Sequence, residues 1–304
     1  MLVYRQKDNL IHRLHPLTTV AFVGVIFFLS LLFSHPFFLL GLFVALGAVI
    51  LASDSYREWK GYLKCTLGMM ALLMLINACV AQAGSTVLMA GPRVPGLGNV
   101  RITLEELAFG AGMGLRLLVI VSVFCLYTHA LHPDKVLKLL SRWGSRSVLA
   151  VTLATRLFPL MIEDFHRVTD VQRCRGVKFA TGKFQERVHN LGPVASVLLL
   201  SSLERSWQLA ESMYARGYGS GPRTCYTSEL WRPRDHLVIL ALLVAMVIAV
   251  GAAWHGWSAY NYYPRLASVS RDELKTAAAF TFFLSVPAIL NRGWKKWPWL
   301  QSRI

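Results

Sequence analysis

Residues 17–52 read LTTVAFVGVIFFLSLLFSHPFFLLGLFVALGAVILA, and this stretch decides the fold class of the chain. It contains no Asp, Glu, Lys or Arg, and only Ser34 and His35 separate two apolar blocks, Leu17–Phe33 and Pro36–Ala52. Each block approaches the roughly 20 residues that a helix needs to cross a hydrocarbon layer of about 30 Å. Because lipid offers no water to backbone polar groups, such blocks are expected to be helical. They predict two membrane-spanning helices joined by a tight turn.

Four further apolar blocks follow along the chain. Of the 304 residues, 55% are hydrophobic and 16% are charged, whereas soluble domains average about 25% charged residues. The apolar excess is concentrated in these blocks, which run from Leu63 to Val80, Leu107 to Ala130, Leu237 to Trp254 and Ala277 to Leu290. The composition therefore predicts an all-α integral membrane protein with about six transmembrane helices, plus long amphipathic helices on the cytoplasmic side.

The distribution of Lys and Arg predicts the orientation of the spans. With the N-terminus inside, the inner segments hold 26 of the 32 basic residues and the outer segments hold 5. Since basic loops stay in the cytoplasm, both termini are predicted to be cytoplasmic. This bias, together with contact to anionic membrane lipids, accounts for the net charge of +16 without nucleic-acid binding. We expect a multi-pass protein of the bacterial or archaeal inner membrane.

Segment lengths divide the chain into three parts. Residues 1–130 are predicted to form a membrane bundle of four spans, and residues 237–304 a hairpin of two spans. Residues 131–236 are too long for a simple loop and are predicted to form amphipathic helices on the cytoplasmic side. Residues 81–103, between the third and fourth spans, are rich in Gly and Pro, so an irregular loop is expected there.

The long middle segment carries three predicted helices. The boundaries come from its proline and glycine residues and from the spacing of its apolar residues. The helices run from His132-Pro133-Asp134 to Gly144, from about Ser147 to Cys174 and from about Gly192 to Ala215. On the second helix, Glu163 and Arg167 have the four-residue spacing of a favourable surface ion pair.

Both long helices of this segment end in arginine followed by glycine. The second ends in Cys174-Arg175-Gly176 and the third in Ala215-Arg216-Gly217. An arginine at a helix C-terminus complements the helix dipole and presents a planar fork to carboxylates, which favours a protein contact. The simpler interpretation is a charged helix end with a glycine cap. Arg292-Gly293 is a third such pair without this context.

The two helix ends resemble the paired coupling motifs of the transmembrane T component of energy-coupling factor (ECF) transporters, the EcfT or CbiQ family. The resemblance covers most of residues 10–235 and extends to positions around both motifs. The supporting positions are Arg156, Pro159, Glu163 and Gln172 on the second helix and Arg205 and Met213 on the third.

This resemblance implies a non-catalytic role. In that family the T component transmits ATP-driven motion from two ABC-type ATPase subunits to a small substrate-binding membrane subunit. It implies no catalytic, metal-binding or cofactor-binding residue in this chain, since the partner ATPases bind ATP and Mg. The separate membrane subunit selects the cargo, which is a vitamin or a transition metal ion such as cobalt or nickel. The implied ATPase contacts are Cys174, Arg175, Gly176, Ala215, Arg216 and Gly217.

Two places depart from the family pattern. Cys174 stands where the family usually has Ala or Ser, and because the residue is still small we expect the contact to be kept. Near the N-terminus the family often carries Asp-Pro-Arg-x-Lys, whereas this chain has His15-Pro16-Leu17-Thr18-Thr19. The role of that basic pair is therefore not carried over.

A permease that binds its own substrate is an alternative function. It would need polar residues that converge in mid-membrane, and Arg116 in the fourth span is the candidate. Two environments suit Arg116 equally, a buried functional position or the outer third of the bilayer. Gly110 and Gly114 of the same span form a small face, which fits either another helix of the bundle or a partner subunit.

A membrane-embedded enzyme is a third possibility. It would need a cluster of acidic residues or histidines at one membrane face. Spaced histidine pairs such as His12 and His15 have no carboxylate or thiolate neighbours, so no metal site is predicted. The acidic residues outside the spans are isolated from one another, which argues against an active site; they are Asp134, Asp164, Asp170 and Asp235.

Overall fold

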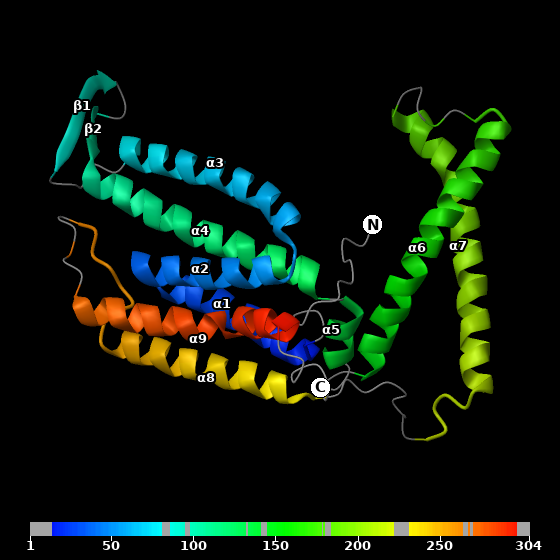
Figure 1. Ribbon diagram of the computed structural model, residues 1–304. Helices are drawn as coiled ribbons and strands as arrows, with labels where there is room; N and C mark the ends of the chain where they lie inside the picture. The colour runs from blue at the N-terminus through cyan, green and yellow to red at the C-terminus, as the bar shows by residue number, and fades with distance from the viewer. Residues whose placement is uncertain are drawn as a thin grey trace. The chain divides into compact units, whose positions relative to one another are not determined.

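Over the residues that the structure describes, the chain is helical with one two-stranded ribbon (Figure 1). The computed structural model describes residues 14–80, 86–94, 98–131, 133–140, 145–177, 179, 184–221, 231–263, 267 and 270–296. Two compact units make up the chain. The first consists of residues 1–136 and 229–304, and the second of residues 137–228.

The first unit is a helical bundle. Among the described residues, α3, α4, α8 and α9 are long and apolar enough to cross a membrane. Helices α1 and α2 have 17 residues each, the lower end of the spanning range. All six predicted blocks are therefore helical, and the four longer helices extend beyond the predicted blocks. The helices are α1 (Pro16–Leu32), α2 (Pro36–Ala52), α3 (Tyr56–Val80), α4 (Leu104–Ala130), α8 (Pro233–Trp254) and α9 (Arg271–Lys296).

Proline and capping side chains fix where several of these helices begin. Helices α1, α2 and α8 each have proline at the start, where its missing N–H costs nothing and its fixed φ suits the helix. At α4, Thr103 and Glu106 form a capping box. The N–H of Glu106 donates to Thr103 Oγ1, and the N–H of Thr103 donates to a carboxylate oxygen of Glu106.

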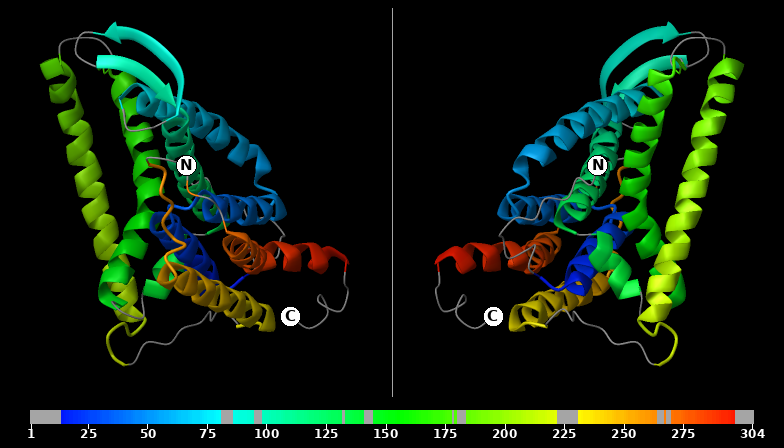
Figure 2. Two further views of the ribbon diagram at one scale, coloured as in Figure 1. Left: turned by 90° about the vertical axis from the view of Figure 1, so that its left-hand side faces the viewer. Right: turned by 90° about the vertical axis from the view of Figure 1, so that its right-hand side faces the viewer.

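Helix α2 lies inside the bundle, in contact with α1, α3, α4 and α9 (Figures 1 and 2). At one end of it the rings of Phe33 and Phe38 stack with centroids 4.8 Å apart, and Phe280 of α9 meets Phe33 edge-on at 5.8 Å. Further along the bundle, Trp59 donates its indole N–H to Ser122 Oγ at 2.9 Å, so its polar end is satisfied. The bundle thus has a well-packed interior of its own.

Gly110 and Gly114 let α4 approach α3 closely. A Cβ at Gly110 would lie 2.9 Å from the Cα of Met74, and a Cβ at Gly114 would overlap the side chain of Met70. Of the two partners that the sequence left open for this glycine face, the structure therefore shows a helix of the same bundle.

Residues 87–103 contain an antiparallel ribbon. Strand β1 (Val87–Val94) pairs with β2 (Gly98–Thr103), and the register shifts between Ala90 and Arg93, around Gly91-Pro92. Gly and Pro are typical of such irregularities in strands. The expectation of an irregular loop was therefore wrong for these described residues, because their Gly and Pro accompany a bulge between paired strands.

The middle segment forms α5 (Pro133–Leu140), α6 (Ser145–Cys174) and α7 (Phe184–Ala215). Helix α5 begins at the predicted proline, and residues 141–144, which include its predicted end, lie outside the described residues. Helix α7 begins well before the predicted start at Gly192, so that prediction was wrong. Gly192 and Pro193 lie inside the helix instead, where the proline removes one backbone hydrogen bond without ending it.

Candidate coupling site

The end of α6 closes in a Schellman motif. The N–H of Val177 donates to the carbonyl of Gln172 at 3.1 Å, and the N–H of Gly176 donates to the carbonyl of Arg173 at 2.9 Å. In this motif the two residues after a helix satisfy its last carbonyls. Gly176 has a φ of +89°, a left-handed conformation that costs other residues about 1–2 kcal/mol. Glycine is therefore required here by the backbone.

The end of α7 closes in the same way. The N–H of Tyr218 donates to the carbonyl of Met213 at 3.0 Å, and the N–H of Gly217 donates to the carbonyl of Tyr214 at 2.9 Å. Gly217 has a φ of +75°. Each bond and the left-handed glycine recur at the corresponding position, so the two helix ends share one backbone geometry.

This geometry places the two candidate arginines at equivalent positions. Arg175 and Arg216 each precede the left-handed glycine, and both are exposed, as are Cys174 and Ala215. Among the described residues, no hydrogen bond or ion pair engages either guanidinium group. Both lie beside the negative end of a helix dipole, and each can bind a carboxylate through two parallel hydrogen bonds.

The supporting residues fall into three groups. Gln172 and Met213 supply the backbone carbonyls that accept the Schellman bonds, a role that does not depend on their side chains. Arg205 is half-buried on α7, and its guanidinium group donates a hydrogen bond to Asp164 of α6. Exposed positions of α6 carry Arg156, Pro159 and Glu163.

Asp164 links the two long helices. Its Oδ2 accepts a hydrogen bond from Arg205 Nη2 of α7 at 2.7 Å, and its Oδ1 is bonded by Arg167, three residues along α6. The hydrogen bond from Arg205 is the main reason that the pKa of the Asp164 carboxyl lies below its ordinary value of 3.8. The partner of Arg167 is therefore Asp164 and not the predicted Glu163.

Asp170 and Asp235 also have structural partners, whereas the side chain of Asp134 lies outside the described residues. Asp170 pairs with Arg173 at 3.2 Å on the surface of α6. Asp235 is buried at the start of α8 and accepts hydrogen bonds from the backbone N–H groups of His15 and Arg232. These contacts cap and connect helices, so they give no support to an acidic active site.

Helix α7 presents a stripe of large apolar side chains to its surroundings. The exposed fractions are 64% for Leu199, 66% for Leu203, 76% for Trp207 and 83% for Tyr214. The spacing of four, four and seven residues places them along one face of the helix. Contiguous apolar surface of this kind marks contact with another protein or with a membrane.

Arg116 is bound by the turn between α1 and α2. Its Nη2 donates to the carbonyl of Phe33 at 3.0 Å and to Ser34 Oγ at 2.9 Å. The hydroxyl of Tyr262 donates to the carbonyl of Ser34 at 3.2 Å. Arg116 is partly buried, and its guanidinium group holds the end of α1 beside the turn between the first two predicted spans. These hydrogen bonds of Nη2 give the Arg116 side chain a structural role that needs no bound substrate.

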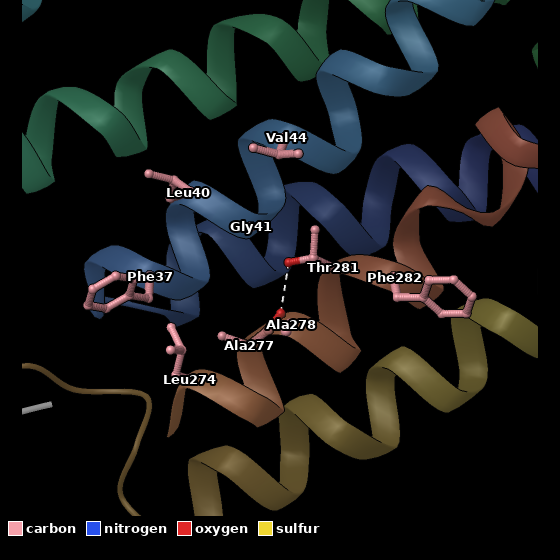
Figure 3. Close-up of a pocket in the computed structure, with 9 residues that line it drawn as sticks. All are labelled: Phe37, Leu40, Gly41, Val44, Leu274, Ala277, Ala278, Thr281 and Phe282. Carbon is pink, nitrogen blue, oxygen red and sulfur yellow. Dashed lines mark hydrogen bonds between the residues drawn. The ribbon is translucent and has the colours of Figure 1, made fainter. Parts of the chain in front are cut away.

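A groove of about 390 Å³ lies between α2 and α9 (Figure 3). The hydroxyl of Thr281 donates to the carbonyl of Ala277 within α9 at 2.7 Å, and a Cβ at Gly41 would overlap that hydroxyl. Ligand sites for polar molecules bring several polar groups together, and this groove does not. It therefore gives the substrate-binding permease no support. The other lining residues are Phe37, Leu40, Val44, Leu274, Ala278 and Phe282.

The divergent N-terminal segment is tied to the start of α8. The backbone N–H of His15 donates to Asp235 Oδ1 at 2.8 Å, and its ring stacks on Trp231 with centroids 4.5 Å apart. The His15 side chain also accepts a bond from the N–H of Leu17 and so caps α1. His15 thus has a structural place in this chain, at the position where the family often carries aspartate.

Comparison with known proteins identifies the family of this chain. The family model described as "CbiQ: Cobalt transport protein" matches residues 7–226. The chain is 27% identical over 256 residues to the energy-coupling factor transporter transmembrane protein EcfT of Bacillus subtilis, covering 79% of this chain and 93% of that protein. It is 28% identical over 258 residues to EcfT of Thermotoga maritima, covering 81% and 91%. The chain therefore belongs to the CbiQ family, as a transmembrane T component of energy-coupling factor transporters.

Proposed function

We propose that this protein couples ATP hydrolysis by two ABC-type ATPase subunits to the movement of a separate substrate-binding membrane subunit. One ATPase would bind the end of α6 and the other the end of α7. The observation that carries this proposal is the repetition of one capped geometry, because two identical, exposed Arg-Gly ends suit two copies of the same kind of partner.

The chemistry of the two ends predicts an acidic partner surface. Arg175 and Arg216 are exposed and free of hydrogen bonds within the described residues. Carboxylates in a groove of each ATPase would bind these guanidinium groups in the bidentate geometry that arginine favours. Removing one partner of a buried, hydrogen-bonded charge pair costs about 2–5 kcal/mol, enough to separate such subunits.

The orientation follows from the basic residues of the chain. The excess of Lys and Arg, 26 in the predicted inner segments against 5 in the outer ones, supports a cytoplasmic location for α6 and α7. Both termini would also be cytoplasmic in a bacterial or archaeal inner membrane. The ATPases and their nucleotide lie in that compartment, and anionic lipids would contact the basic surface.

The apolar stripe on α7 is proposed to contact the substrate-binding subunit. Leu199, Leu203 and Trp207 are exposed in this chain, and a small membrane protein would cover them. That subunit would select the cargo, a vitamin or a transition metal ion such as cobalt or nickel. This chain would bind neither the cargo nor ATP and Mg, and it would catalyse no reaction itself.

The proposal is tested by purifying the tagged protein in mild detergent and identifying its companions. Two ATPase subunits and a small membrane protein are expected.

Changing Arg175 and Arg216 together to Ala should leave the protein in the membrane and remove the ATPases. The matched control is Arg173→Ala, two residues before Arg175, whose guanidinium group pairs with Asp170. Full ATPase content in the double variant would refute the assignment, and a chain that purifies alone with a bound small molecule would favour the permease.

A further inference from the structure

The sequences of α6 and α7 correspond at a constant offset. Residues 154–177 align with residues 195–218 when 41 positions are added, without a gap. The correspondence includes the two motifs and the residues before them. The pairs with identical residues are Ala154 and Ala195, Leu157 and Leu198, Glu163 and Glu204, Arg175 and Arg216, and Gly176 and Gly217. Asp164 and Arg205 are also separated by 41 residues, so they occupy equivalent positions.

The two helices run in opposite directions (Figures 1 and 2). Two equivalent antiparallel helices are related by a two-fold axis that passes between them. At this axis a residue of one helix faces the equivalent residue of the other, and away from the axis it faces a non-equivalent residue. The contact between Asp164 and Arg205, at 2.7 Å, marks that point in this unit. Identical charges would repel there, and the two helices carry opposite charges at this position.

The contact is substantially removed from water. The side chain of Asp164 is 11% exposed and that of Arg205 is 32% exposed. Arg167 satisfies the second carboxylate oxygen, although its own side chain is 72% exposed. A charge with this degree of burial destabilises its surroundings once its partner is removed. The ion pair therefore fixes how the two helices are placed along each other.

The contact lies at the same distance from both helix ends. Arg175 lies eleven positions after Asp164, and Arg216 lies eleven positions after Arg205. At 1.5 Å per residue each arm is about 16 Å long. Because the helices are antiparallel, the two motifs lie at opposite ends of the pair, with the ion pair midway between them.

We propose that Asp164 and Arg205 form a charge-specific pin at the crossing of α6 and α7 that sets the spacing of the two Arg-Gly ends. Both are positioning residues, because neither belongs to the motifs that would bind the ATPases. The functional part of this inference rests on the proposed function. The pin itself is a property of the isolated chain.

The test places one spin label about a turn before each motif, at the equivalent exposed positions Val171 and Ser212. Both residues are changed to Cys for labelling, in a chain whose own cysteines have been replaced. The distance between the labels is measured by pulsed electron paramagnetic resonance in the detergent-purified full chain. A single narrow distance peak is expected. Asp164→Arg should abolish that peak, and adding Arg205→Asp should restore it, because the new carboxylate would face guanidinium groups from positions 164 and 167. Asp170→Asn, which breaks an ion pair within α6, is the control and should keep the peak.

The complex is then measured with the same variants. The Asp164→Arg variant should still co-purify with the ATPases, because its two Arg-Gly motifs are intact, but it should lose cargo uptake. The double variant with Arg205→Asp should regain uptake. An unchanged distance peak in Asp164→Arg, or no recovery of the peak in the double variant, would overturn the pin. If the peaks respond as expected but the chain without substitutions binds no ATPase, the proposed function fails and the pin stands.

Discussion

The two units of this chain differ in what holds them together. In the first unit, α2 alone has nine buried residues, and aromatic rings stack around its start. In the second unit, the buried residues among those described are Asp164, Thr169 and Val194. The second unit is therefore held mainly by backbone hydrogen bonds within its helices and by an ion pair. The comparison teaches that the membrane bundle supplies its own interior, whereas α6 and α7 leave their apolar faces to be covered by something else.

The largest expected effect comes from breaking the interior of the bundle. Phe38 is fully buried and stacks on Phe33, so Phe38→Ala should lower the free energy of unfolding by about 3–5 kcal/mol. Thermal unfolding of the purified protein in detergent measures the change. Phe28→Ala, at a position that is 58% exposed, is the control and should change stability by less than about 0.5 kcal/mol. Equal losses in the two variants would mean that the bundle has no specific core.

A smaller effect is expected at the ends of the second unit. Gly217→Ala places a side chain at a φ of +75° and 3.2 Å from Ser220 Oγ, which should cost about 1–2 kcal/mol locally. Hydrogen exchange should then become faster in the last turn of α7, and less ATPase should co-purify. Gln208→Ala, at an exposed position of the same helix, is the control and should change stability by less than about 0.5 kcal/mol. Unchanged exchange in Gly217→Ala would contradict the capping argument.

The pH dependence of the second unit should appear only in acid. Because the pKa of folded Asp164 lies below its ordinary value of 3.8, ionisation favours the paired state at any pH above that value. The contribution is lost as the pH falls below 3.8, through the lower folded pKa. The distance between labels at positions 171 and 212 should therefore stay constant from about pH 8 to 5 and spread below about pH 4. A spread that begins near neutral pH would point to another titrating group.

The smallest change in stability is expected on the apolar stripe of α7. Trp207 is 76% exposed, so Trp207→Ala should alter the unfolding free energy by no more than about 0.5 kcal/mol. The same substitution should reduce the amount of substrate-binding subunit that co-purifies, because an exposed aromatic residue contributes chiefly to binding. A large loss of stability would show that Trp207 packs within the chain, and the contrast between the units would weaken.

Local patterns in the sequence predicted much of the fold. The predicted bounds of the second span, Pro36–Ala52, are those of α2, and the glycines expected to end α6 and α7 have positive φ. These features depend on apolar runs, on proline at helix starts and on glycine at helix ends, all of which act within a few residues. The positions of the candidate arginines at the ends of α6 and α7 followed from the same local signals.

Contacts between distant residues could not be predicted in this way. The bond from Arg116 to Phe33 spans 83 positions, and that from Arg205 to Asp164 spans 41. No period in the sequence encodes which helix an arginine will face, since this depends on how the helices pack. The early start of α7 was missed for a related reason: Pro193 usually ends a helix, but here the helix continues through it.

The equal arms of α6 and α7 have a mechanical consequence. A rigid lever with its fulcrum midway transmits the same torque from equal forces applied at either end. Since each motif arginine lies eleven positions from the ion pair, equal displacements at the two ends would turn the crossing through angles of equal size. Neither end would then have a mechanical advantage over the other.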